Sequence, residues 1–187
     1  MLLHDVTFVV TDVETTGFSP QLGSITEIAM VKVKQKKIID EFTSLVNPQM
    51  PIPYEITQIT GIDDNLVSDA PTAGEIASKI SLFLGDGIFT AHNVSFDLGF
   101  VNSTLVKGLI PPLNNRQVCT LKLAKKLLSH LKSKSLENVT RELQIAHRHK
   151  HRAAGDAYAT AEVLICFLDI LEKKFDVTTL EELFAYQ

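Results

Sequence analysis

The chain has 187 residues, a length that favours a single domain with a sizeable hydrophobic core. Hydrophobic residues make up 45% and charged residues 21% of the sequence, which excludes a disordered, collagen-like or disulfide-scaffold protein. The formal net charge of −4 argues, taken as a total, against a nucleic-acid partner.

The first part of the chain predicts three consecutive β-strands. Residues 7–11 form a β-prone run that ends at Asp12, and this run is typical of a buried strand. Residues 25–33 and 38–46 are two further β-prone runs, and the short polar segment between them indicates an antiparallel hairpin. We therefore expect the fold to begin with three strands.

A helix, a strand and a second helix are predicted next. Three prolines within residues 48–53 interrupt regular structure, and residues 71–84 then carry apolar side chains at helical spacing. Residues 88–91 form a short apolar strand that leads to Asn93, a residue type that caps helices. Apolar side chains at helical spacing after Asn93 predict the second helix.

The rest of the chain is predicted to be mainly helical. Apolar stripes predict helices over residues 120–131 and 135–143. A polar loop over residues 146–152 precedes a long helix over residues 153–174. The tail from residue 178 to 187 again carries apolar side chains at helical spacing.

The order of these elements indicates an α/β fold. It fits neither a strict βαβ alternation nor a segregation of strands from helices, so we expect a mixed sheet with helices packed over it. The domain is expected to span residues 1–175. Residues 176–187 then form a helical tail that either packs back on the domain or leads to a partner or a further domain.

Cysteine usage and hydropathy bear on the compartment. Cys119 and Cys166 lie far apart and lack the spacing of a zinc site or a disulfide framework, which favours a reducing, cytoplasmic location. The first five residues do not resemble a signal peptide. The apolar stretch over residues 163–168 is too short to span a bilayer, so no membrane partner is expected.

Two carboxylates follow the first predicted strand. Residues two apart on an extended chain share a face, so Asp12 and Glu14 can present their side chains to one point. Two adjacent anions repel unless a cation lies between them, and Mg²⁺ and Mn²⁺ prefer oxygen ligands. The alternative is a polar turn closed by Thr15, Thr16 and Gly17.

Two further motifs combine histidine with aspartate. The segment His92 to Asp97 follows the strand over residues 88–91, and the segment His151 to Asp156 precedes the long helix. Each has a structural alternative, because asparagine caps helices and a helix dipole favours an acid in its first turn. Taken alone, each motif is a weak functional signal.

The three motifs together resemble the DEDDh 3′–5′ exonuclease family, which includes the proofreading epsilon subunit of bacterial DNA polymerase III. DVETTG, HNVSFD and HRAAGDA occur in the order and spacing of the family's three exonuclease motifs. The resemblance covers residues 7–175 and implies a ribonuclease H-like fold with a mixed five-stranded sheet flanked by helices.

The resemblance also implies roles for single residues. By it, Asp12, Glu14, Asp97 and Asp156 hold two Mg²⁺ or Mn²⁺ ions, and His151 is the general base. His92, His147 and His149 do not stand in the motif's register and are poorer candidates for the base. Two metals would clamp the attacking and leaving oxygens at phosphorus, and a histidine with an ordinary pKa near 6.5 can accept a proton at neutral pH.

Four residues match positions that hold the terminal nucleotide in the family. They are Thr15, Glu55, Thr60 and Asn93. Some members carry histidine in place of Thr60, and turn and cap chemistry is an equal alternative for all four.

The charges are segregated along the sequence. Residues 107–152 contain 11 basic and 2 acidic side chains, whereas the flanking segments are acidic. We expect this basic block to follow a phosphate backbone toward His151, the alternative being a solvated helix surface. Its candidate contacts are Lys122, Lys125, Lys126, Lys132, Lys134, Arg148, Lys150 and Arg152.

The sequence thus predicts a metal-dependent exonuclease that releases nucleoside 5′-monophosphates from single-stranded or frayed 3′ ends of DNA, in proofreading or repair. A DNA polymerase subunit is a candidate partner. Two alternatives stay open: an exoribonuclease that trims RNA, and a nucleic-acid-binding module that does not cleave. The presence of all five chemical residues weighs against the last.

Overall fold

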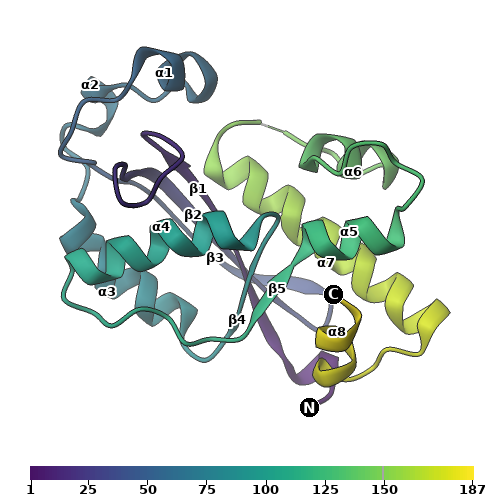
Figure 1. Cartoon of the computed structure of the whole chain (residues 1–187). Coiled ribbons are helices and arrows are strands. Elements are labelled where there is room, and N and C mark those ends of the chain that lie inside the picture. The colour runs from purple at the N-terminus through teal and green to yellow at the C-terminus, as the bar shows by residue number, and fades with distance from the viewer. Residues whose placement is uncertain (149) are drawn as a thin grey trace.

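A five-stranded mixed sheet forms the centre of the computed structural model, which describes residues 1–148 and 150–187 (Figure 1). The strand order is β3-β2-β1-β4-β5; β1 pairs antiparallel with β2 and parallel with β4. This arrangement confirms the predicted fold class. The strands are β1 (Thr7–Thr15), β2 (Ile25–Lys34), β3 (Lys37–Leu45), β4 (Ile88–Ala91) and β5 (Gln117–Cys119).

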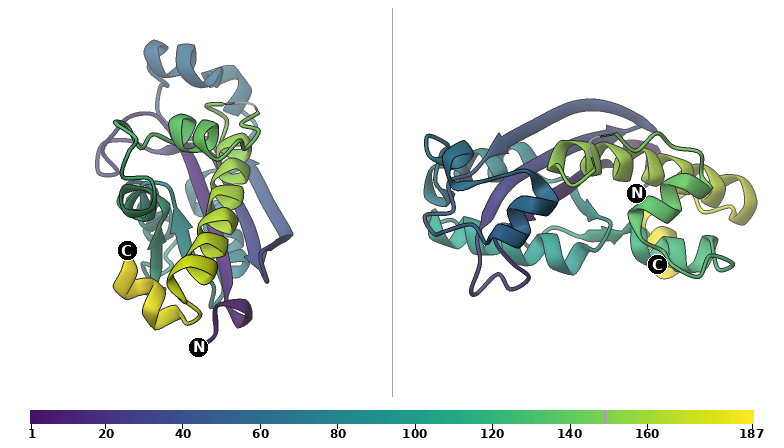
Figure 2. Two further views of the ribbon diagram at one scale, coloured as in Figure 1. Left: turned by 90° about the vertical axis from the view of Figure 1, so that its right-hand side faces the viewer. Right: turned by 90° about the horizontal axis from the view of Figure 1, so that it is seen from above.

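Helices cover both faces of the sheet (Figures 1 and 2). One core cluster joins one sheet face to α5 (Thr120–Leu127), α6 (Leu136–Glu142), α7 (Ala153–Phe175) and α8 (Leu180–Tyr186). The other face packs against α3 (Ala73–Leu84) and α4 (Val94–Lys107). Within the described ranges, no helix is both long and apolar enough to cross a membrane.

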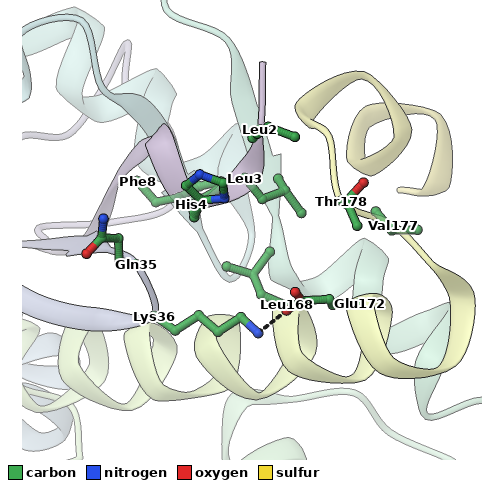
Figure 3. A pocket seen from close by; sticks show the side chains of 10 residues that line it. All are labelled: Leu2, Leu3, His4, Phe8, Gln35, Lys36, Leu168, Glu172, Val177 and Thr178. Carbon is green, nitrogen blue, oxygen red and sulfur yellow. Dashed lines mark hydrogen bonds and ion pairs between the residues drawn. The ribbon is translucent and has the colours of Figure 1, made fainter.

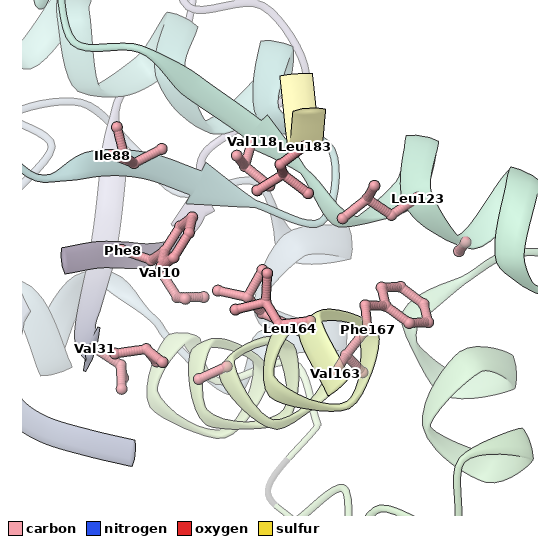
Figure 4. Packing of buried hydrophobic residues seen from close by; sticks show 14 of the residues in the cluster. Phe8, Val10, Val31, Ile88, Val118, Leu123, Val163, Leu164, Phe167 and Leu183 are labelled. Atoms are coloured by element: carbon pink, nitrogen blue, oxygen red, sulfur yellow. The ribbon is translucent and has the colours of Figure 1, made fainter. Parts of the chain in front are cut away.

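The core on the α7 side is built from alternate residues of β1 and one stripe of α7. Figure 4 shows Phe8 and Val10 of β1 facing Leu164 of α7. Farther toward its N-terminus, α7 presents only alanines, Ala153, Ala157 and Ala161, each fully buried. Small side chains every four residues let the start of the helix lie close to β1, which places the first turn of α7 beside the later residues of β1.

The sheet is incomplete beside the second half of β1. The parallel ladder between β1 and β4 ends at Val10 and Thr90, although β1 continues to Thr15 along β2. The chain leaves β4 at Ala91 and enters α4 at Val94. The N-terminus of α4 therefore lies beside the part of β1 that carries the acidic motif.

Several element boundaries differ from the sequence-based predictions. The first strand does not end at Asp12, because pairing with β2 continues to Thr15. The helix predicted to reach residue 131 ends at Leu127. Leu128 still donates its N–H to Ala124 O at 2.9 Å as the C-cap, and Leu128 and Leu131 pack on the core beyond the helix end. Strand β5 has only three residues and lacked a clear sequence pattern.

Regular structure also occurs where the prolines predicted none. Two short helices, α1 (Tyr54–Thr60) and α2 (Asp64–Val67), form a small lobe around Ile62. Pro53 occupies the N-cap position of α1, where a missing N–H costs nothing, and Gly61 ends α1 with a left-handed φ of 71°. A 3-10 turn over Leu3–Asp5 precedes β1.

The C-terminal tail packs on the α7 side of the sheet. Thr179 and Glu182 form a capping box at the start of α8, and Leu183 is fully buried. The side-chain amide of Gln187 accepts a hydrogen bond from Cys119 N at 2.9 Å and donates one to Gln117 O at 2.9 Å. The division of the chain at residue 175 stays a prediction.

Candidate active site

Three carboxylates converge where β1 meets α7. Asp12 and Glu14 are two residues apart on β1 and share a face, and Asp156 lies in the first turn of α7. One ligand oxygen from each of these residues lies within 4.8 Å of the others. The sequence-based pairing of Asp12 with Glu14 is thus realised within a strand, and the tertiary fold adds Asp156.

Asp97 approaches the same point from the opposite layer. It lies in the first turn of α4 and is 5% exposed. Burial raises the pKa of Asp97 to about 8, against the opposing effect of hydrogen bonds from the backbone amides of Asp97 and Val13. The amide of Val13 lies in the part of β1 that has no pairing with β4. Because β4 ends earlier, the Asp97 carboxylate can reach this amide.

Mutual repulsion disfavours full ionisation of the cluster. Burial, followed by the charges of Asp97, Asp156, Glu14 and Glu27, raises the pKa of Asp12 well above its ordinary value. Burial and the charge of Asp156 raise the pKa of Glu14 to about 7. At the 4.8 Å limit, each pair of carboxylates repels by roughly 3 kcal/mol at an effective dielectric constant of about 20.

This donor set fits hard divalent cations. Carboxylate oxygens are the ligands that Mg²⁺ and Mn²⁺ prefer, and a cation would remove the repulsion that raises these pKa values. The acidic residues also border a pocket of about 340 Å³. Its lining includes, besides Asp12, Asp97 and Asp156, the side chains of His92, Asn93, Phe96, Glu137, His147, Lys150 and His151.

The histidines of the site have different environments. His151 is exposed at the pocket, and its backbone N–H donates to Asp156 Oδ2 at 3.0 Å. The His147 ring contacts Asp156 directly through Nε2, and its side chain is only 8% exposed. The sequence alone assigned no role to His147. The sequence feature that includes it is the run of histidines at every second position, 147, 149 and 151. His149 lies outside the described residues.

His92 is part of the scaffold. Its Nδ1 lies 3.0 Å from Thr120 Oγ1, and its Nε2 lies 2.8 Å from Lys134 O. Burial lowers the pKa of His92. Both ring nitrogens are therefore engaged, in agreement with its low ranking as a base.

The four predicted substrate contacts fall into two groups. Asn93 lines the pocket, and its side chain makes no capping hydrogen bond. Thr15 adjoins Glu14 but donates its hydroxyl to Gly17 O at 2.6 Å. Glu55 and Thr60 lie on α1, and neither is among the described residues that line the pocket. The Thr60 hydroxyl donates to Ile56 O and accepts from Ile62 N, so the alternative of turn chemistry is what this structure displays for Thr60.

The basic block divides into engaged and exposed side chains. Lys150 pairs with Glu137 at 2.8 Å, Arg152 pairs with Glu27, and Lys134 donates to backbone carbonyls. The other five candidates are exposed and have no ion-pair partner among the described residues: Lys122, Lys125, Lys126, Lys132 and Arg148. Because Leu121 N donates to His92 O at 2.9 Å, the N-terminus of α5 starts beside the pocket. Farther along α5, Lys126 Nζ lies 5.3 Å from the centre of the Tyr186 ring on α8.

A second pocket lies at the far end of β1, away from the carboxylates. Figure 3 shows its apolar lining, which includes Leu3, Phe8 and Leu168, and the Lys36–Glu172 ion pair at its rim. Its volume is about 610 Å³. It lacks converging carboxylates, so its chemistry does not resemble that of the acidic site.

Sequence comparison identifies relatives across nearly the whole chain. The family model RNase_T, described as Exonuclease, matches residues 9–164. A PolC-type DNA polymerase III of Bacillus cereus is 40% identical over 176 residues, covering 94% of this chain and 12% of that protein. The corresponding protein of Caldanaerobacter subterraneus subsp. tengcongensis is 42% identical over 166 residues, covering 89% of this chain and 12% of that protein.

Comparison with solved structures also finds exonucleases. Exonuclease X in complex with 5′ overhanging duplex DNA is similar at 29% identity with a TM-score of 0.73, over 94% of this chain and 96% of that one. Escherichia coli exonuclease I in complex with a dT13 oligonucleotide is 21% identical with a TM-score of 0.80, over 96% of this chain and 46% of that one; this likeness shows the fold alone.

Proposed function

This chain belongs to the exonuclease family RNase_T, and we propose that it hydrolyses DNA from the 3′ end and releases nucleoside 5′-monophosphates. The observation that carries the proposal is the meeting of Asp12, Glu14 and Asp156 within 4.8 Å, with Asp97 beside them. These four carboxylates come from β1, α4 and α7, as the three exonuclease motifs require.

Divalent metal is assigned to the carboxylate cluster. Asp12, Glu14 and Asp156 are the proposed ligands, and Asp97 completes a site for a second Mg²⁺ or Mn²⁺ ion. When bound, such ions supply positive charge at the phosphorus and lower the pKa of the attacking water. The protein contributes a rigid strand and two helix starts that hold the carboxylates in place, so little reorganisation is needed on substrate binding.

His151 is the proposed general base. Its exposed ring stands at the pocket while its backbone amide is hydrogen-bonded to Asp156, a proposed ligand, so the imidazole can accept a proton from water near the cluster. Asn93 is the described pocket residue whose amide is best placed to contact the terminal nucleotide. Contacts from Thr15, Glu55 and Thr60 stay predictions.

DNA is the proposed substrate. Exonuclease X, at 29% identity, was solved with 5′ overhanging duplex DNA, and the PolC-type relatives are DNA polymerases, which supports a proofreading role beside a polymerase. The chain spans only 12% of the length of those polymerases, so polymerase association belongs to the proposal. The exposed lysines of α5 would contact the phosphate backbone.

A labelled-oligonucleotide assay tests this function. Single-stranded DNA and RNA of one sequence, each labelled at the 5′ end, are incubated with the protein in Mg²⁺ or Mn²⁺. We expect a ladder of labelled strands that shortens from the 3′ end on DNA one nucleotide at a time, with release of unlabelled mononucleotides and no cleavage in EDTA. Shortening of RNA alone would replace the proposal by an exoribonuclease. Binding without shortening of either substrate would leave a non-catalytic module.

Asp12→Asn is the control for contamination. It keeps the shape of the side chain but removes the charge that attracts the metal, so cleavage should be lost while the fold persists. Activity that survives in Asp12→Asn would have to come from another nuclease or from another site.

A further inference from the structure

A fifth acid lies against the proposed metal ligands. Glu27 on β2 stands directly opposite Glu14 on β1, and its side chain is 3% exposed. Directly opposed residues on neighbouring strands bring their side chains within contact distance, and like charges in such a pair are destabilising. The charge of Glu27 adds to the raised pKa of Glu14. A buried carboxylate in this position therefore needs a partner.

The partner comes from the loop before α7. Arg152 Nε and Nη2 donate to the two oxygens of Glu27 at 3.0 and 2.7 Å, which is a bidentate pair. The backbone N–H of Ala153 donates to Glu27 Oε2 at 2.8 Å. Both oxygens of Glu27 are thus directed at nitrogen donors, and Glu27 is not among the three residues whose oxygens meet within 4.8 Å. We refer to Glu27, Arg152 and Ala153 N together as the Glu27 clamp.

The Glu27 clamp replaces the missing cap of α7. Arg152 occupies the N-cap position, and its own side chain makes no capping hydrogen bond. A carboxylate that accepts from the first helical amide satisfies one of the orphan donors and complements the helix dipole. In α7 this carboxylate is supplied by a strand 125 residues earlier in the chain.

The clamp is also connected to the proposed site residues on either side of it, His151 and Asp156. Arg152 O accepts a hydrogen bond from Asp156 N at 3.2 Å, which ties the proposed metal ligand to the clamped residue. His151, one residue before the clamp, has a left-handed φ of 59°. A non-glycine residue holds such a conformation only when its surroundings enforce it.

We propose that Glu27 is a positioning residue for the active site: through Arg152 and the first amide of α7, it fixes the separation of Asp156 and His151 from the carboxylates of β1. The inference rests on the proposed function for its kinetic consequences. It assigns Arg152 to Glu27 and not to the nucleic acid.

The experiment uses Glu27→Gln and Arg152→Gln in the full chain. Glu27→Gln keeps the length of the side chain, and Arg152→Gln keeps a shorter polar side chain at a position that is 43% exposed. We expect Mn²⁺ affinity, measured by calorimetry without DNA, to fall about 10- to 100-fold, as for other residues that orient metal ligands. The kcat for oligonucleotide cleavage should fall by a similar factor, while KM changes less than about threefold.

Two further readouts separate positioning from general stability. Exchange of the Ala153 and Asp156 amides should accelerate in Arg152→Gln, and the double variant should be no worse than the poorer single variant, because one interaction is removed either way. The matched control is Lys36→Gln, which removes ion pairs to Asp169 and Glu172 near the other end of α7. It should leave Mn²⁺ affinity and kcat unchanged.

Three results would overturn the inference. Unchanged Mn²⁺ affinity and kcat in both variants would show that the clamp does not position the site. A rise in KM alone for Arg152→Gln would make Arg152 a nucleic-acid contact. An equal loss of metal affinity in Lys36→Gln would show that the loss in the clamp variants comes from lower stability of α7 and not from positioning of the site. Metal affinity and amide exchange require no nuclease activity, so they test the clamp even if the proposed function fails.

Discussion

The His147 ring is hydrogen-bonded to the Asp156 carboxylate, whereas His151, in the register of the exonuclease motif, meets the same carboxylate only through its backbone amide. His147 is nearly buried and His151 is exposed at the pocket. The two histidines therefore have separable roles: the ring of His151 is free to exchange protons with water, and the ring of His147 is committed to a proposed ligand.

Substitution of each histidine by alanine tests this division. His151→Ala is expected to lower kcat by about 10²- to 10⁴-fold, the usual contribution of a general base, with Mn²⁺ affinity retained. The pH–rate profile should lose the limb that reports the base.

His147→Ala is expected to change Mn²⁺ affinity, because Asp156 loses its partner. Calorimetry and a pH series of cleavage rates measure both effects. If His147→Ala loses the limb and His151→Ala keeps it, the assignment of the base moves to His147.

Asp97→Asn is expected to change the metal stoichiometry. Asp97 approaches from α4, while Asp12, Glu14 and Asp156 already form a three-carboxylate group without it. We therefore expect calorimetry to record one Mn²⁺ ion in Asp97→Asn against two in the unaltered protein, with kcat lowered at least about 100-fold. Complete loss of Mn²⁺ binding would show instead that the four carboxylates act as one indivisible site.

The raised carboxylate pKa values predict an unusual pH dependence of stability. Between the ordinary value of 4.5 and about 7 for Glu14, and between 3.8 and about 8 for Asp97, the folded chain holds protons that the unfolded chain has released. The free energy of unfolding of the metal-free protein should therefore fall as pH rises from about 4.5 to about 8. The expected total change is on the order of a few kcal/mol.

Denaturant titrations at several pH values, with EDTA or with Mg²⁺, measure this effect. Saturating Mg²⁺ should restore stability at pH 8, because a cation at the cluster favours the ionised carboxylates. Glu14→Gln serves as the control and should reduce the pH dependence in EDTA, with the contribution of Asp97 remaining. A metal-free protein that gains stability over this range would contradict the assignment of the raised pKa values.

The exposed lysines of α5 are expected to set the salt dependence of DNA binding. Replacement of Lys122, Lys125 and Lys126 by glutamine should weaken binding of single-stranded DNA and reduce the slope of log K against log salt by about 0.7 for each lost phosphate contact. The catalytic rate at saturating DNA should be retained. Lys79→Gln on α3, which packs on the opposite face of the sheet, is the control for loss of a lysine away from α5. An unchanged slope in the triple variant would show that these lysines are solvated and do not contact the phosphate backbone.

Leu183→Ala tests whether the tail is part of the domain. Leu183 of α8 is fully buried in the core cluster of the α7 face. Its truncation should lower the free energy of unfolding by about 2–5 kcal/mol, with Mn²⁺ affinity unchanged because the carboxylates lie at the other end of β1. Thermal or urea unfolding measures the change. A loss below about 0.5 kcal/mol would indicate a tail that is separable from the domain over residues 1–175.

Much of the fold followed from local pattern. The strands of residues 25–33 and 38–46, the helix after Pro71 and the long helix after Arg152 were each predicted, and each is present in the structure with small boundary shifts. These segments are long enough for periodicity to reveal them. Strand β5 and the helices α1 and α2 are too short for periodicity to reveal them, and β5 forms by pairing with β4, which lies about 28 residues earlier in the chain.

Sequence alone predicted the four acids and His151 as site residues, because their motifs have a recognisable order and spacing. It also indicated the segregation of charge, which shows that the net charge of −4 conceals a basic block over residues 107–152. The tertiary structure decided which basic side chains are exposed and which are committed to acids, as Arg152 is to Glu27. It also brought His147 to Asp156 and left Thr60 engaged in its own helix end. The physical reason is that residue spacing fixes which side chains share a face of one element, whereas contacts between elements depend on how closely those elements pack.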